Sequence, residues 1–190
     1  MPVASWFGLG SRLLGLYAFG CLLAPQAWGG LKSFESIEYG YAVKYPDDWH
    51  PQILSGIFYI ESFPPSSAVR GARIPKGGAG ISISVPPQLM PGQGRMPQSM
   101  DAWVSIGTAR RHVWGKRAFD LKGSPGLISV IEVKTQCCSV PPVQETIQWY
   151  FQIDGHFFLA EVAYWQGDPS AGRFTDTLRT IVLSLRLSHR

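Results

Sequence analysis

The chain has 190 residues, of which 45% are hydrophobic and 16% are charged, and its formal net charge at pH 7 is +4. This composition is typical of a globular protein, and the positive excess is too small to predict nucleic-acid binding. Because the sequence contains no asparagine, N-glycosylation is excluded. Three cysteines, one of them near the N-terminus, are too few for a disulfide framework.

Residues 1–29 are predicted to be a secretory signal peptide. Arg12 is the only charged residue in this segment, and an apolar run from Leu13 to Ala24 follows it. That run is shorter than the roughly 20 residues that a helix needs to cross a bilayer. Cleavage is expected after Ala27-Trp28-Gly29, because the signal peptidase accepts small side chains at the last and third-last positions.

Export places the mature chain in the periplasm or outside the cell. A lipid anchor at Cys21 is disfavoured, because Phe19 is bulkier than the side chains that lipoprotein signals carry there. Residues 30–190 are long enough for one core and are predicted to form a single domain.

The first half of this domain is predicted to hold three strands and a helix. Alternating residues over 39–45 predict a strand with one buried face, ended by Pro46. Ser99 is expected to cap a helix that runs to about Val113, in which Gly107 costs about 1 kcal/mol relative to alanine and needs packing to hold it. The remaining expectations are strands at 57–63 and 81–85 and exposed loops at 66–80 and 86–97.

The second half is predicted to consist of strands and a final helix. Asp154-Gly155 predicts a type I′ hairpin turn, because glycine adopts positive φ freely. Asp168 is expected to cap the helix, which buries Phe174, Leu178 and Ile181 on one face. The strands are expected at 118–122, 127–135, 145–153 and 156–165, with a short closing strand near 183–187.

Two segments resemble the PsbP-like superfamily, which includes PsbP, Mog and DcrB-like domains. The first is Gly40-Tyr41-Ala42-Val43-Lys44-Tyr45-Pro46-Asp47-Asp48-Trp49, and the second is the final helix with Ser184-Leu185-Arg186-Leu187. The resemblance implies an α+β fold, an α/β/α sandwich with a central, mostly antiparallel sheet of about six strands flanked by helices. Because members of the superfamily bind very different partners, it implies little about function.

A basic cluster is the first candidate site. Arg110, Arg111, Lys116 and Arg117, together with His112, place positive groups close together at the expected end of the helix. Such a cluster is a candidate for binding another envelope protein or an anionic membrane surface. The alternative is that these cations stabilise the helix dipole and stay solvated.

Cys137 and Cys138 form the second candidate site, a redox pair in a loop. Adjacent thiols can form a strained disulfide, join two molecules or contribute to a soft-metal site, and the alternative is two thiols without a function.

Asp47, Asp48 and His50 are polar neighbours, but successive residues of an extended chain point apart. The sequence therefore predicts no metal site, cofactor site or catalytic residue.

These observations predict a non-enzymatic exported protein that binds or helps to assemble another exported or membrane component. The alternative function is carriage of a small apolar ligand or lipid inside the sandwich. A hydrolase is disfavoured, because no nucleophile, base and orienting group can be assembled from the sequence. The oligomeric state and the identity of the partner are not indicated.

Overall fold

The computed structural model describes residues 29–54, 56–64, 74–89, 96–109, 111–123, 126–137 and 143–188. The predicted signal peptide lies almost entirely outside these residues. None of the helices in the described part is both long enough and apolar enough to cross a membrane.

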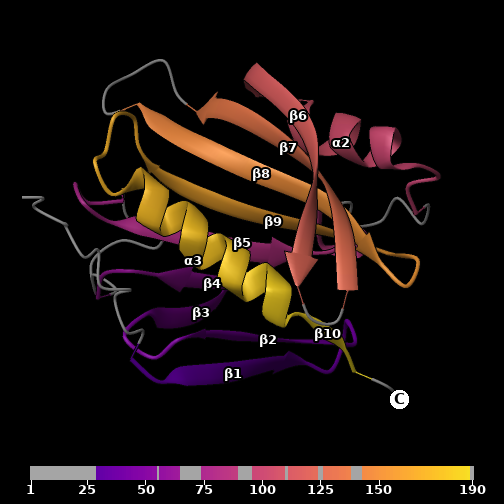
Figure 1. Ribbon diagram of the computed structural model, residues 1–190, viewed down its shortest axis with the longest axis horizontal. Coiled ribbons are helices and arrows are strands. Elements are labelled where there is room, and N and C mark those ends of the chain that lie inside the picture. Colours follow the sequence, from indigo (N-terminus) through magenta and orange to yellow (C-terminus); the bar gives the residue numbers. More distant parts are fainter. Residues whose placement is uncertain are drawn as a thin grey trace, which may run out of the picture.

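A seven-stranded antiparallel sheet is the centre of the molecule (Figure 1), and its strand order is β3-β4-β5-β9-β8-β7-β6. Successive strands along β6 to β9 are neighbours, whereas β5 pairs with β9 and so joins the two halves of the sheet. The strands are β3 (His50–Leu54), β4 (Ile57–Glu61), β5 (Ala79–Ser84), β6 (His112–Gly123), β7 (Gly126–Cys137), β8 (Gln144–Ile153) and β9 (His156–Trp165).

A second, three-stranded antiparallel sheet has the order β1-β2-β10. Its central strand β2 buries the alternating residues Tyr41, Val43 and Tyr45, as the pattern in the sequence predicts. The strands are β1 (Leu31–Ser36), β2 (Tyr41–Pro46) and β10 (Arg186–Leu187), and the helices of the molecule are α1 (Pro86–Leu89), α2 (Met100–Thr108) and α3 (Ala171–Ser184).

Helices α3 and α2 cover opposite faces of the large sheet. The larger core cluster lies on the face of α3, where Leu178 and Ile181 are fully buried and the small sheet contributes Tyr41. The smaller cluster lies under α2, where Trp103 packs edge-on against Tyr150 and donates a hydrogen bond from Nε1 to the carbonyl of Phe158 at 3.0 Å. The predicted sandwich is therefore present, with seven strands in its main sheet and a separate small sheet beside it.

Several local predictions are confirmed. Asp154 and Gly155 both have positive φ, 47° and 81°, as a type I′ turn requires. The hydroxyl of Ser99 accepts a hydrogen bond from the backbone N–H of Ala102 at 3.2 Å and caps α2. On α3, Phe174 is buried together with Leu178 and Ile181.

The ends of both helices were predicted incorrectly. Helix α2 ends at Thr108 rather than near Val113, because the chain from His112 onward pairs with β7 and joins the sheet. Helix α3 begins at Ala171 rather than directly after Asp168. The Asp168 carboxylate instead ties two segments together, since it accepts hydrogen bonds from the backbone N–H groups of Ser170 at 2.8 Å and Gly77 at 2.9 Å.

Two strands, one short helix and one buried segment were not predicted. The helix is α1, which occupies the start of the loop expected at 86–97. The alternation in β1 is hidden by polar residues, although Phe34 stacks on Phe58 with ring centroids 4.1 Å apart. Strand β3 contains Pro51, which is tolerated because β3 is an edge strand. The end of the loop expected at 66–80 is also buried, because Ala79 and Gly80 already belong to β5.

Candidate functional site

The structure separates the residues of the predicted basic cluster. Arg110 lies outside the described residues, and Arg111 follows α2, while Lys116 and Arg117 lie on β6. Lys116 approaches Asp101 of α2 at 3.6 Å, whereas Arg117 contacts Glu132 and lies over the ring of Phe119, whose centroid is 5.2 Å from the guanidinium carbon. Consecutive strand residues point to opposite faces, so these two cations lie on opposite faces of the sheet.

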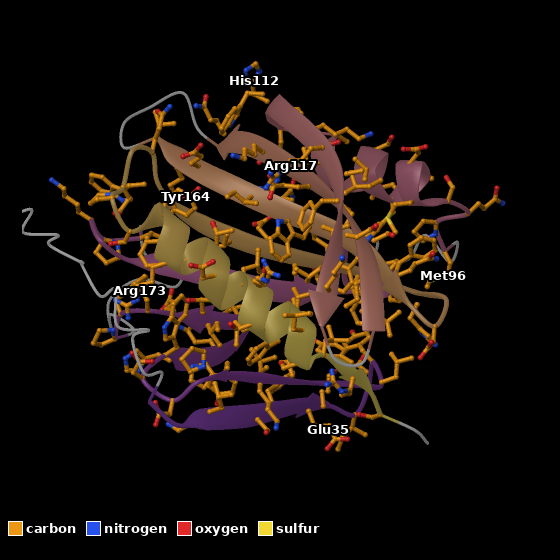
Figure 2. The ribbon with its side chains drawn as sticks, viewed as in Figure 1. Glu35, Met96, His112, Arg117, Tyr164 and Arg173 are labelled. Carbon is orange, nitrogen blue, oxygen red and sulfur yellow. The ribbon has the colours of Figure 1, made fainter. Side chains whose placement is uncertain are left out.

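Arg117 is part of a hydrogen-bonded cluster on the face covered by α3. Its Nε and Nη2 donate to Glu132 at 2.8 and 3.2 Å, and Trp149 Nε1 donates to the same carboxylate at 3.0 Å. The Glu132 side chain is 2% exposed and the Arg117 side chain is 66% exposed. Figure 2 labels Arg117 over the sheet and His112 at the start of β6. Arg117 therefore neutralises a buried carboxylate, and its predicted partner-binding role stays a prediction.

The outer edge of β6 exposes two large apolar side chains. Val113 is 42% exposed and Trp114 is 46% exposed. A β-bulge leaves Trp114 without an opposite residue on β7, because the register passes from the pair Val113 and Thr135 to the pair Gly115 and Lys134. The ammonium of Lys134 lies 5.2 Å from the centroid of the Trp114 ring, a cation–π contact that supports the indole. Val113 and Trp114 are called the β6 edge patch below.

A polar pocket of about 510 Å³ lies between the end of α2 and the large sheet. Arg111 Nη2 pairs with Glu161 Oε2 at 3.0 Å, and Gln148 Nε2 donates to the same oxygen at 2.8 Å. Gln148 and Glu161 are direct neighbours across β8 and β9. Ser82 and Ser84 of β5 add hydroxyl groups, and the apolar walls come from Ile57, Ile106 and Leu159.

Buried polar atoms without partners are concentrated on the face of the sheet that carries this pocket. In the part of the chain that the structure describes, the side-chain oxygens of Thr135, Gln148 and Tyr150 are buried without a hydrogen-bond partner. The Tyr150 hydroxyl lies against Gly107, which lines the pocket. Burial raises the pKa of Tyr150 above its ordinary value near 10, so the phenol, which is neutral at physiological pH in any case, becomes still harder to ionise.

The sequence prediction missed this pocket. Gln148 is one of several polar residues of β8, Glu161 is the only acidic residue of β9, and nothing local indicates that the two face each other across a hairpin. The signal becomes visible only when the hairpin is folded about Asp154-Gly155, because the register then pairs the two residues directly. Arg111 was predicted as part of the basic cluster rather than as the partner of Glu161.

The other candidate residues do not form a site within the described part of the chain. Asp47 and Asp48 are exposed, Trp49 is buried, and His50 lies opposite Glu61 in the β3–β4 pairing. Among the described residues there is no group of three or more His, Cys, Asp or Glu side chains that could hold a metal ion.

The predicted redox pair lies at the end of β7. Cys137 is the last residue of that strand, whereas Cys138 and the side chain of Cys137 are outside the described residues. Their redox role therefore stays a prediction.

No protein-family model matches the chain. No curated protein matches it either. Among solved structures, the chain is similar to cyanobacterial PsbP from Synechocystis, with 12% identity and a TM-score of 0.45, over 98% of this chain and 99% of that one.

Two further solved structures are similar. A Pseudomonas aeruginosa protein of unknown function, described as a putative regulator, has 14% identity and a TM-score of 0.41 over 80% of this chain and 96% of that one. A Bacteroides thetaiotaomicron protein has 13% identity and a TM-score of 0.49 over 86% of this chain. This chain spans 50% of the Bacteroides protein. These similarities concern the arrangement of the elements and carry no inference about a partner or ligand.

Proposed function

We propose that this protein is a non-catalytic binding protein of the cell envelope, which docks another exported or membrane component along the outer edge of β6. The observation that carries the proposal is the β6 edge patch, in which Val113 and Trp114 are each more than two-fifths exposed on an edge strand of the large sheet.

An edge strand presents backbone N–H and C=O groups to which a second chain can add as a further strand. Among the described residues, no strand pairs with the outer side of β6, which at 12 residues is one of the two longest strands. Natural edge strands are usually protected by charges, prolines or bulges. Here the bulge carries a tryptophan, which favours binding over protection.

Trp114 has the properties of an interface anchor. Tryptophan is enriched among the residues that contribute most to binding energy, and a side chain already held in place loses little entropy on binding. The contact with Lys134 holds the indole in this way. The partner segment is therefore expected to be extended, with apolar side chains where it meets Val113 and Trp114.

The non-catalytic part of the proposal rests on the sequence, in which no nucleophile, base and orienting group were found together. Export rests on the predicted signal peptide. Binding of an anionic membrane through the basic cluster has less support, because Lys116 and Arg117 point to opposite faces and each already has an acidic neighbour.

The proposal is tested by site-specific photo-crosslinking. A photoreactive amino acid replaces Val113 in the full chain, expressed in its own host, and crosslinked products are compared with those of a Trp114→Ser version. A defined adduct is expected, and Trp114→Ser should reduce it at least tenfold, since loss of a tryptophan anchor commonly costs about 2 kcal/mol or more.

Ile53 provides the matched control. It is 55% exposed on β3, the opposite edge strand of the same sheet, so Ile53→Ser removes an exposed apolar side chain without touching β6. An adduct that survives Trp114→Ser, or is lost equally in Ile53→Ser, contradicts docking at the β6 edge. Native mass spectrometry of the same preparation tests the alternative prediction, since a carrier of an apolar ligand should retain lipid.

A further inference from the structure

We infer that the polar pocket beside α2 binds a neutral, polyhydroxylated small molecule about the size of a monosaccharide. The site is separate from the β6 edge patch. It is built by Arg111, Gln148 and Glu161 together with the hydroxyl groups of Ser82 and Ser84.

One residue that lines the pocket has a buried polar atom without a hydrogen-bond partner among the described residues. Gln148 is fully buried, its nitrogen is engaged by Glu161, and its oxygen has no partner among the described residues. A buried polar atom without a partner costs about 1–3 kcal/mol, so native proteins nearly always satisfy such atoms with protein, water or ligand. Because Gln148 lines the pocket, a molecule in the pocket is the available source of a donor.

The charges that line the pocket favour a neutral ligand. Arg111 and Glu161 neutralise each other at 3.0 Å, so the pocket has no net charge from this pair. The C-terminal end of α2, which carries the negative end of the helix dipole, forms part of the wall through Ile106 and Gly107. An anionic ligand would be repelled by that helix end, and a cationic ligand would compete with Arg111 for Glu161. A neutral ligand avoids both costs.

The pocket wall combines hydrogen-bond donors with hydrogen-bond acceptors. The contact with Glu161 uses Nη2 of Arg111, and a guanidinium carries donors on its other nitrogen atoms as well. The carboxylate and the Gln148 oxygen are acceptors, and the serine hydroxyls do both. Because each hydroxyl group of a sugar also donates and accepts, planar side chains of this kind can bind vicinal hydroxyls in pairs.

The size and walls of the pocket agree with this class of ligand. A volume of about 510 Å³ lies in the range of small-molecule sites. Ile57, Ile106 and Leu159 offer apolar surface to the C–H groups of a sugar ring. A purely apolar ligand would instead leave the Gln148 oxygen unsatisfied, so the pocket does not suit the lipid carrier that the sequence suggested as an alternative.

Ligand-observed NMR and calorimetry on the mature chain test the inference. The neutral probes are D-glucose, D-galactose and myo-inositol, and the charged probes are D-glucuronate and D-glucosamine. At least one neutral probe is expected to bind more tightly than either charged probe. Gln148→Leu and Ala109→Trp are each expected to weaken that binding at least tenfold, because the first removes the free acceptor and the second fills the pocket from an exposed position.

The controls separate loss of binding from loss of folding. Gln152→Leu makes the same change on the same strand at an exposed position and should leave binding unchanged. Trp114→Ser should also bind the probe normally, because Trp114 lies outside the pocket. Probe binding therefore tests the pocket independently of the docking proposal. The inference is overturned if no neutral probe binds, if a charged probe binds best, or if Gln148→Leu and Ala109→Trp bind as the unmodified chain does.

Discussion

Gly107 lies in the last turn of α2. The sequence and the structure predict opposite effects on protein stability when this residue is replaced by alanine. In an exposed helix, alanine is more favourable than glycine by about 0.8–1.0 kcal/mol, so the sequence alone predicts that Gly107→Ala stabilises the protein. In the structure, an added Cβ would collide with the Tyr150 hydroxyl and lie 2.8 Å from the ring carbons Cε1 and Cζ.

The magnitude of the collision follows from how Tyr150 is held. Tyr150 is fully buried, and Trp103 packs against its ring with an interplanar angle of 85° and centroids 6.0 Å apart. The indole of Trp103 is itself fixed by its hydrogen bond to Phe158. Because both rings are fully buried and packed against each other, the cost of about 1–3 kcal/mol typical of overpacking should exceed the helix gain. We expect a net loss of about 1–2 kcal/mol.

Urea and thermal unfolding of the mature chain measure this difference. For a domain of this size, a loss of about 1–2 kcal/mol lowers Tm by roughly 2–8 °C. Gly172→Ala is the matched control, because Gly172 lies in α3 and an added Cβ there meets nothing within 4 Å, so this change should stabilise the protein by about 0.4–1 kcal/mol. If Gly107→Ala stabilises the protein as Gly172→Ala does, the packing of Tyr150 against α2 is refuted.

Three further predictions concern stability. Arg117→Met should lower the free energy of unfolding in urea by about 1–2 kcal/mol, because it leaves the buried Glu132 carboxylate with one donor. The double change with Glu132→Leu should recover part of that loss. An effect of Arg117→Met below about 0.5 kcal/mol would contradict the role of Arg117 in this hydrogen-bonded cluster. Gly155→Ala should cost about 1–2 kcal/mol at φ +81°, whereas Gly126→Ala, in similarly open space, should not, and equal unfolding midpoints would refute this. Burial raises the pKa of Tyr59 to about 12 from its ordinary value near 10, so the folded state keeps the phenol proton at a pH where the unfolded state releases it. The stability contributed by Tyr59 should therefore fall between about pH 10 and 12. Tyr59→Phe should remove one late-ionising phenol from the ultraviolet titration.

The elements that were predicted well depend on residues close together in the sequence. The turn at Asp154 and Gly155 needs only two residues that tolerate positive φ, and the cap at Ser99 needs a hydroxyl three residues before an amide. The buried face of α3 follows from the spacing of its apolar residues.

The elements that were missed depend on partners far away in the chain. The residues after Thr108 have a helical pattern but form a strand, because β6 gains hydrogen bonds by pairing with β7. Local periodicity does not reveal such a distant partner. Strand β1 has a mostly polar sequence and is defined by its pairing with β2. The edge exposure of Trp114 likewise requires the strand order, which places β6 outermost.

By itself, the sequence determined the class of fold, the β8–β9 hairpin, the buried face of α3 and the need for something to compensate Gly107. Only the tertiary structure decided that the compensating group is Tyr150, that Arg117 serves Glu132, and that Arg111, Gln148 and Glu161 surround one pocket. The physical reason is the sequence separation of the residues that interact. Turn geometry, capping and amphipathic spacing act between residues a few positions apart, whereas steric fit and the pairing of buried charges are set by residues that meet only when the sheet is assembled.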